Sequence, residues 1–267
     1  MKYYKVGFIG TGNIATAIYN GITSSGYIKY EDIMVFDADE SKFCTFADKG
    51  SAIAINACEL TEKCEFVFLT VKPQIYNSVL TEIKSCASNT CFIDVAAGIS
   101  ILTVKKLLGF DAPVIRVMPN TPLMVGVGAT ALVKTSPVSD EQFIFIKGCF
   151  DSCGITVVVD ESDINTVIAA SGSSPAYIMK FSKILIDYAI NSGLSPSDAR
   201  NLVIQTLAGC AKLVSESNED ISKLISNVTS PNGTTAAGIS ALDENGFEEC
   251  VITCLKATVK RAEELSI

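Results

Sequence analysis

The sequence predicts an α/β fold in two parts, an N-terminal doubly wound sheet and a C-terminal all-helical domain. Three observations support this prediction. Short β-branched runs alternate with helical patterns up to about residue 158, the strand signal ends at Glu161, and helical spacing fills the rest of the 267 residues. We therefore expect one domain at residues 1–158 and a second at residues 159–267.

Five apolar runs in the first part have the length of buried strands, and segments of helical periodicity separate them. The runs are YKVGFI (4–9), DIMVFD (32–37), EFVFLTV (65–71), TCFIDVA (90–96) and PVIRVM (113–118). Because alternating strands and helices form parallel sheets, we expect a parallel sheet with helices on both faces. Residues 128–133 and 154–160 should extend this sheet. The helix between them has Ser139 as its expected N-cap and Gly154 as its expected stop.

The second part carries three stripes in which apolar or small residues follow 4-3-4 helical spacing. They are Tyr177, Phe181, Ile184 and Tyr188; Val203, Leu207, Cys210 and Val214; and Phe247, Val251, Cys254 and Thr258. Ile178 and Leu185 widen the first stripe. We therefore expect that helix to be buried on more than one side, either inside a bundle or between subunits.

The ten cysteines are scattered without a CxxC pair, and the chain has no histidine to complete a mixed zinc site. We expect reduced, mostly buried thiols, with Cys250 and Cys254 as small core residues one helical turn apart. We expect no bound metal. The lack of histidine also excludes any mechanism that depends on a histidine acid or base.

The formal charge of −8 and the absence of a Lys/Arg cluster argue against nucleic acid and anionic membranes as partners. The least polar stretch, PLMVGVGATALV, is shorter than the roughly 18 residues that a membrane span needs. The first ten residues, MKYYKVGFIG, lack the pattern of a signal peptide. We therefore expect a cytoplasmic protein that does not bind membranes.

A glycine fingerprint follows the first predicted strand directly and precedes a helical pattern. Gly10, Gly12 and Ala15 have G-x-G-x-x-A spacing within VGFIGTGNIATAI. Glycines here let the backbone approach a pyrophosphate, and the helix N-terminus supplies free amides. A tight glycine turn without a ligand is the alternative. The strand, the helix and the second strand that follows favour a dinucleotide site in a Rossmann-type domain.

Asp37 ends the second predicted strand, 22 residues beyond Ala15. A carboxylate there can accept hydrogen bonds from the adenosine ribose hydroxyls and would repel a 2′-phosphate, which favours NADH over NADPH. The alternative role is an Asx cap of the following helix, and nearby Lys42 could weaken the repulsion. Ligands of doubly wound sheets lie outside the carboxyl ends of strands, so residues 70–73 and 95–100 should border the cofactor as well.

Three further motifs are RVMPNTP (116–122), SGSSPAY (171–177) and VTSPNGTT (228–235). Together with the motifs above, and in the same order along nearly the whole chain, they resemble the pyrroline-5-carboxylate reductase family. The resemblance implies NADPH- or NADH-dependent reduction of the cyclic imine 1-pyrroline-5-carboxylate to L-proline, the last step of proline biosynthesis. It also implies a helical domain that interlocks two subunits into a homodimer, which in the family can assemble into a decamer of five dimers. Two departures stand out, because Asn232 and Ser174 replace glycines that are usual in the family.

The resemblance assigns residues to the cofactor and to the substrate. The implied cofactor contacts are Ile9, Gly10, Thr11, Gly12, Asn13, Ile14, Asp37, Asn56, Thr70, Val71, Lys72, Pro73, Ala96, Ala97, Gly98 and Asn227. The implied substrate contacts are Glu161, Gly233, Thr234 and Thr235, with Thr235 as the catalytic residue that steadies the ring nitrogen. Asn232 tolerates a left-handed backbone and so should keep the turn.

Several residues have an alternative role. Glu161 could serve as a helix-start charge, Thr234 and Thr235 could cap the following helix, and Arg116 could form an internal salt bridge rather than bind a ligand. Two other functions also stay open: a related imine or 3-hydroxyacid reductase, for which Lys180 and Lys183 lie in the relevant region, and a cofactor-binding regulator without activity.

Overall fold

The computed structural model describes residues 3–265, which belong to two compact units. The first unit comprises the chain through Ser173 together with the segment from Thr258 onward, and the second comprises Ser174–Ala257. Compact packing thus places residues 159–173 with the sheet, whereas the sequence predicted a boundary at 158–159. The reason is that Ile164 and Ile168 are buried in the core of the first unit.

One eight-stranded sheet forms the first unit, in the order β3-β2-β1-β4-β5-β6-β7-β8. The strands are β1 (Tyr4–Ile9), β2 (Ile33–Phe36), β3 (Ala52–Ile53), β4 (Cys64–Leu69), β5 (Cys91–Asp94), β6 (Val114–Met118), β7 (Gly128–Lys134) and β8 (Gly154–Val158). The strand order reverses between β1 and β4, which confirms the doubly wound fold.

The expectation of a wholly parallel sheet was wrong at one pair, because β6 and β7 run antiparallel. Only the short 3₁₀ segment η5 (Thr121–Val125) and its flanking residues connect these strands. So short a connection returns the chain antiparallel, whereas a parallel crossover needs a dozen or more residues.

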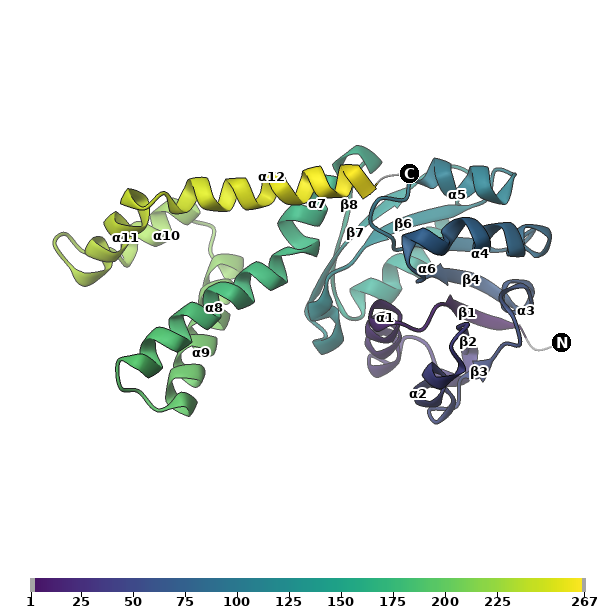
Figure 1. Cartoon of the computed structure of the whole chain (residues 1–267), viewed down its shortest axis with the longest axis horizontal. Helices are drawn as coiled ribbons and strands as arrows, with labels where there is room; N and C mark the ends of the chain where they lie inside the picture. The colour runs from purple at the N-terminus through teal and green to yellow at the C-terminus, as the bar shows by residue number, and fades with distance from the viewer. Residues whose placement is uncertain (1–2, 266–267) are drawn as a thin grey trace. The chain divides into compact units, whose positions relative to one another are not determined.

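Helices cover both faces of the sheet (Figure 1). They are α1 (Asn13–Ser24), α2 (Cys44–Ala47), α3 (Ala57–Lys63), α4 (Tyr76–Ile83), α5 (Ile101–Leu108), α6 (Asp140–Asp151) and α7 (Ile164–Val167). One apolar cluster contains side chains of α3, α4 and α5, and the other contains side chains of α1, α2 and α6. Successive side chains of a strand point to opposite faces of the sheet and so belong to different clusters. In β4, Val67 and Leu69 belong to the cluster with α3, α4 and α5, and Phe66 and Phe68 belong to the cluster with α1, α2 and α6.

Ser139 caps α6 as predicted. Its hydroxyl accepts a hydrogen bond from the Gln142 amide at 3.2 Å, and the Gln142 side chain accepts one from the Ser139 amide at 3.0 Å. The helix ends at Asp151, before the expected stop at Gly154, which instead begins β8.

The described chain after Glu161 contains no strand, as predicted. Its longer helices are α8 (Ser174–Asn191), α9 (Pro196–Glu216), α10 (Ile221–Asn227), α11 (Thr234–Glu244) and α12 (Phe247–Leu265). On α8, the predicted apolar residues Phe181, Ile184 and Tyr188 are 40%, 58% and 74% exposed in a single chain. A single chain therefore does not bury this face. Within residues 3–265, no helix has the length and apolar content needed to cross a membrane.

The expectation of ten reduced thiols was wrong for one pair. Cys58 and Cys86 form a disulfide between α3 and the 3₁₀ turn η4 (Lys84–Cys86). Of the remaining cysteines, Cys64, Cys91, Cys149 and Cys153 are buried, and Cys44, Cys210 and Cys250 are exposed. Cys250 is therefore not a core residue of the single chain, and Cys254 is partly exposed. The pair is 28 residues apart in sequence, on separate elements, so no local pattern indicates it.

Candidate active site

The loop after β1 carries the glycine fingerprint. Gly10 has a positive φ of 96°, and a Cβ added there would lie 2.9 Å from backbone atoms of Thr70. Gly12 has a φ of −73°, open to any residue, and a Cβ added there would meet no atom within 4 Å. The fold therefore requires glycine at Gly10 but not at Gly12. A ligand that approaches the backbone closely would require it at Gly12.

Helix α1 begins directly after this loop. Gly12 is its N-cap, and no side chain caps it there. The amides of the first turn, which includes Asn13 and Ile14, are therefore available to an anion, and the positive end of the helix dipole favours one.

Asp37 lies one residue after β2 and holds the glycine loop. Its Oδ2 accepts hydrogen bonds from the Thr11 amide at 2.8 Å and the Thr11 hydroxyl at 3.1 Å, and its Oδ1 accepts one from the Asp39 amide at 3.0 Å. Lys42 Nζ lies 3.5 Å from Oδ1. Burial raises the pKa of Asp37, but these hydrogen bonds and the Lys42 charge outweigh burial and hold it below its ordinary value. The carboxylate is thus ionised at neutral pH.

A cavity of about 260 Å³ opens where the strand order reverses. Residues from the ends of β1, β2 and β4 and from the following turns line it: Ile9, Gly10, Gly12, Phe36, Asp37, Ala38, Lys42, Thr70, Val71, Lys72, Ile75 and Val79. Seven of the predicted cofactor contacts are among them. Ligands of doubly wound sheets bind at this position.

Sequence reasoning predicted the apolar lining residues Ile9 and Val71 but missed four others, namely Phe36, Ala38, Ile75 and Val79. Phe36 and Ala38 flank Asp37, so the rule that pointed to Asp37 could have included them. Ile75 and Val79 lie in the turn and helix after Pro73, and their i, i+4 spacing on one face was the available signal.

The other predicted cofactor contacts of the first unit lie outside this lining. Thr11 is a buried residue of the glycine loop, and Pro73 begins the 3₁₀ turn η3 (Pro73–Ile75). Asn56 caps α3, where its side chain accepts a hydrogen bond from the Glu59 amide at 2.8 Å. Ala96, Ala97 and Gly98 follow β5, which pairs with β4.

A buried polar network supports the end of β5, and the sequence indicated only one part of it, the internal salt bridge of Arg116. Asp94 is fully buried, and its Oδ1 accepts hydrogen bonds from the Tyr76 hydroxyl at 2.7 Å and the Ala96 amide at 3.0 Å. Arg116 Nε lies 3.9 Å from Asp94 Oδ2, and neither atom has a hydrogen-bond partner in the described chain. Burial raises the pKa of Asp94 to about 6, although the hydrogen bonds and the Arg116 charge limit the rise.

Glu161 extends this network. Its Oε1 accepts hydrogen bonds from Arg116 Nη1 at 3.0 Å and from the Ile101 amide at 2.8 Å, at the start of α5. Arg116 therefore forms the internal salt bridge that was its alternative role. The Glu161 side chain is 33% exposed, and its Oε2 makes no hydrogen bond or ion pair in the described structure.

The loop between α10 and α11 belongs to the second unit. Asn232 has a φ of 60°, which confirms that asparagine keeps the left-handed turn. Gly233 is the N-cap of α11, and within residues 3–265 the hydroxyls of Thr234 and Thr235 make no hydrogen bond. These hydroxyls therefore do not cap the helix. The Asn227 side chain donates a hydrogen bond to Glu219 Oε2 at 3.0 Å.

Comparison with known proteins decides the family. The protein of Escherichia coli K12 named pyrroline-5-carboxylate reductase is 34% identical over 264 residues, which cover 98% of each chain. The chain belongs to the pyrroline-5-carboxylate reductase family. This result confirms the resemblance that the sequence motifs carry.

Family models and solved structures agree with this assignment. The model described as pyrroline-5-carboxylate reductase dimerisation matches residues 161–265, and the model described as NADP oxidoreductase coenzyme F420-dependent matches residues 5–98. A crystal structure of Plasmodium falciparum pyrroline carboxylate reductase with NADP bound has a TM-score of 0.92, 30% identity and full coverage of both chains. The Coxiella burnetii pyrroline-5-carboxylate reductase has a TM-score of 0.89 and 32% identity, again with full coverage of both chains. The match of residues 161–265 to the dimerisation model supports homo-oligomerisation of this chain.

Proposed function

We propose that the protein reduces 1-pyrroline-5-carboxylate to L-proline with NADPH or NADH. The observation that carries this proposal is the full-length match to pyrroline-5-carboxylate reductases, which spans the sheet and the helical part alike. Proline biosynthesis follows from this activity. Cytoplasmic location is part of the same proposal, supported by the composition of the chain.

The residues around the glycine loop fit a dinucleotide. Gly12 leaves open space that a side chain would fill, α1 presents uncapped amides, and the cavity next to them is lined by Asp37. We assign the pyrophosphate to the amides of residues 10–14 and the adenosine ribose to Asp37. Thr70, Val71 and Lys72 would border the dinucleotide at the end of β4, and Ala96–Gly98 at the end of β5, with Asn56 and Asn227 as further contacts. When bound, the reduced nicotinamide supplies the hydride.

The α10–α11 loop is the proposed substrate site. A carboxylate can accept hydrogen bonds from the first amides of α11 and from the Thr234 hydroxyl, which have no other partner in the described chain. Thr235 would hold the ring nitrogen. A cyclic imine that binds already protonated needs no proton shuttle, so a chain without histidine is adequate for the task.

Glu161 is proposed to act in two ways. Its Oε1 anchors Arg116 and the start of α5, which fixes the side chain, while the unpaired Oε2 is available to the substrate. A carboxylate near a cationic imine would stabilise its positive charge.

The assembly we propose is a homodimer formed through the helical part. The apolar face of α8, exposed in a single chain, supports this arrangement, because exposed faces of this kind mark interaction sites. A decamer of five such dimers is the larger assembly that we propose.

The test is a steady-state assay of NADPH and NADH oxidation with pyrroline-5-carboxylate, next to 3-hydroxy acids assayed in the oxidative direction with NAD⁺ and NADP⁺. We expect turnover with the imine and no turnover with the hydroxy acids. Turnover with the hydroxy acids alone would identify the related dehydrogenase instead. Folded protein that binds a nucleotide but turns over neither substrate would identify a regulator without activity.

A further inference from the structure

Two cysteines of the first unit, on separate elements, face each other. Cys58 is the second residue of α3, and Cys86 ends the 3₁₀ turn η4. Their Cα atoms are 5.7 Å apart, within the range that disulfides require, and the two sulfurs are bonded. None of the roles assigned above uses this pair.

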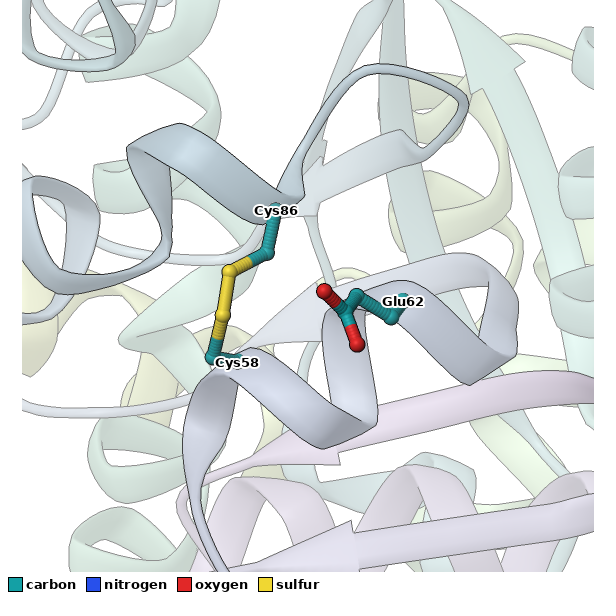
Figure 2. Close-up of side chains that lie close together, drawn as sticks. All are labelled: Cys58, Glu62 and Cys86. Carbon is teal, nitrogen blue, oxygen red and sulfur yellow. A yellow bond between two sulfur atoms is a disulfide. The ribbon is translucent and has the colours of Figure 1, made fainter.

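Glu62 completes a cluster with these cysteines. It follows Cys58 by four residues on α3, so both side chains project from the same helix face. Figure 2 shows the Glu62 carboxylate beside the disulfide, and one ligand atom from each of the three residues lies within 4.8 Å of the others.

The Glu62 carboxylate has no hydrogen bond or ion pair in the described structure. Its neighbour Glu59 differs, because the Glu59 carboxylate accepts from Lys63 Nζ at 2.5 Å and from the Ile55 amide at 2.7 Å. The Glu59 carboxylate thus caps α3 and forms a salt bridge, whereas the Glu62 carboxylate lies beside the two sulfurs without such partners.

Small solutes can reach the cluster from two sides. Glu62 and Cys86 line a surface cavity of about 790 Å³, and Glu62 and Cys58 line another of about 390 Å³. Asp32 also lines the larger cavity and adds negative charge there, whereas Glu65 in the same lining is paired with Lys5, whose Nζ lies 2.6 Å from its Oε2. Such charge favours the approach of a cation.

We propose that Cys58, Cys86 and Glu62 form a binding site for a zinc-class divalent ion once the disulfide is reduced. Two thiolates and a carboxylate suit such an ion, and water would complete a four-coordinate site. Bonds of about 2.3 Å to sulfur and about 2.0 Å to oxygen place tetrahedral ligand atoms roughly 3.5 to 3.8 Å apart. The present cluster reaches that spacing with small side-chain movements.

The disulfide and the metal ion exclude each other. Two molecules of a low-molecular-weight thiol reduce the Cys58–Cys86 bond, which yields two protein thiols and one small disulfide. Binding of the ion then releases the two thiol protons, because thiolates are the ligands. Oxidation removes two of the three ligands, so the ion binds only the reduced protein.

The test compares cadmium and zinc binding by the full-length protein in its disulfide and reduced forms. Cadmium reports thiolate ligands through its ultraviolet charge-transfer absorption, and zinc affinity follows from competition with a chromogenic chelator. Since other cysteines can also bind these ions, the measured quantity is the difference between the two forms. We expect the reduced protein to bind a single additional ion per chain, with thiolate absorption, and the disulfide form to lack it. Equal binding by the two forms would overturn the proposal without the use of any variant.

Variants locate the site. Cys58→Ser and Cys86→Ser should each remove the additional ion, and Glu62→Gln should weaken zinc binding at least about tenfold, since even loss of an outer-shell partner costs that much. Cys44→Ser and Glu82→Gln, which change an exposed thiol and an exposed carboxylate outside the cluster, should bind as the parent does. Unchanged zinc affinity in Glu62→Gln, or loss of the ion in Cys44→Ser, would contradict the assignment. None of these measurements depends on reductase activity.

Discussion

Thr11 donates both its backbone amide, at 2.8 Å, and its hydroxyl, at 3.1 Å, to the same oxygen of Asp37. This pair ties the glycine loop after β1 to the end of β2. Asp37 therefore has a structural role in addition to the recognition of ribose that its position predicts. The two roles can be separated by experiment, because the choice between NADH and NADPH depends on the negative charge that faces the cofactor, whereas the contact with the loop can be changed at Thr11 alone.

Replacement of Asp37 by serine should shift cofactor preference from NADH toward NADPH by about tenfold or more. The reason is that loss of one repulsive charge pair is worth about 1 kcal/mol or somewhat more in a partly solvated site. The ratio of kcat/KM for the two cofactors measures the effect. Thr11→Val is the control, since it weakens the loop contact but keeps the Asp37 charge, and should leave the ratio unchanged. An equal shift in both variants would assign the effect to loop geometry instead.

Gly12→Ala should weaken nucleotide binding at least about tenfold and lower stability only by the preference of an N-cap for glycine over alanine, about 1 kcal/mol or less. A methyl group there meets no protein atom within 4 Å, so the loss of binding arises from contact with the ligand. Gly10→Ala is the contrasting variant, because its φ of 96° and its contact with Thr70 should make it lose about 1 kcal/mol or more of stability. Melting temperature and calorimetric nucleotide binding separate the two effects. Tight binding in folded Gly12→Ala protein would count against the proposed pyrophosphate site.

Asp94 should make stability depend on pH. Its pKa of about 6 in the folded protein exceeds the ordinary value near 3.9, so its contribution to stability is fully present below about pH 3.9 and is lost as pH rises through about 6. The free energy of unfolding of the parent, minus that of Asp94→Asn, should therefore fall by about 2 to 3 kcal/mol between about pH 4 and pH 7. Urea unfolding at a series of pH values measures this difference. If this difference in free energy of unfolding does not change with pH, the pKa of Asp94 is close to its ordinary value.

Thr235→Val should lower kcat/KM for the imine roughly 10- to 200-fold, the cost of about 1.5 to 3 kcal/mol for a lost hydrogen bond to a charged group. Thr234→Val should act mainly through KM if its hydroxyl holds the substrate carboxylate equally in the ground and transition states. Both variants should keep their melting temperature, because neither hydroxyl makes a hydrogen bond in the described chain. A stability loss of about 1 kcal/mol without a kinetic change would indicate caps of α11 after all.

Local patterns predicted most of the fold. The strand β1 was predicted with both of its ends, since an apolar run stops at Gly10. The two-residue strand β3 was not predicted, because it is too short for any periodicity to appear. The antiparallel direction of β7 was also missed, since strand direction depends on the connection and not on the residues of the strand.

The candidate site likewise contains features that the sequence predicted and features that it did not. Asp37 and Thr70 were predicted as neighbours because the carboxyl ends of parallel strands meet at one edge of the sheet. The contact between Asp94 and Tyr76 joins a strand to a helix through side chains far apart in sequence, so no spacing rule indicates it. The Cys58–Cys86 disulfide escaped prediction for the same reason.

The measurement that tests the central claim most directly is the transfer of deuterium from a labelled reduced nicotinamide to the product. The protein, pyrroline-5-carboxylate and NADPH or NADH deuterated at the transferable position should together yield proline that carries a single deuterium on the former imine carbon. Mass spectrometry and NMR of the product identify that label. If folded protein that binds the nucleotide yields no labelled proline with either cofactor, the assignment of this chain as a pyrroline-5-carboxylate reductase is contradicted.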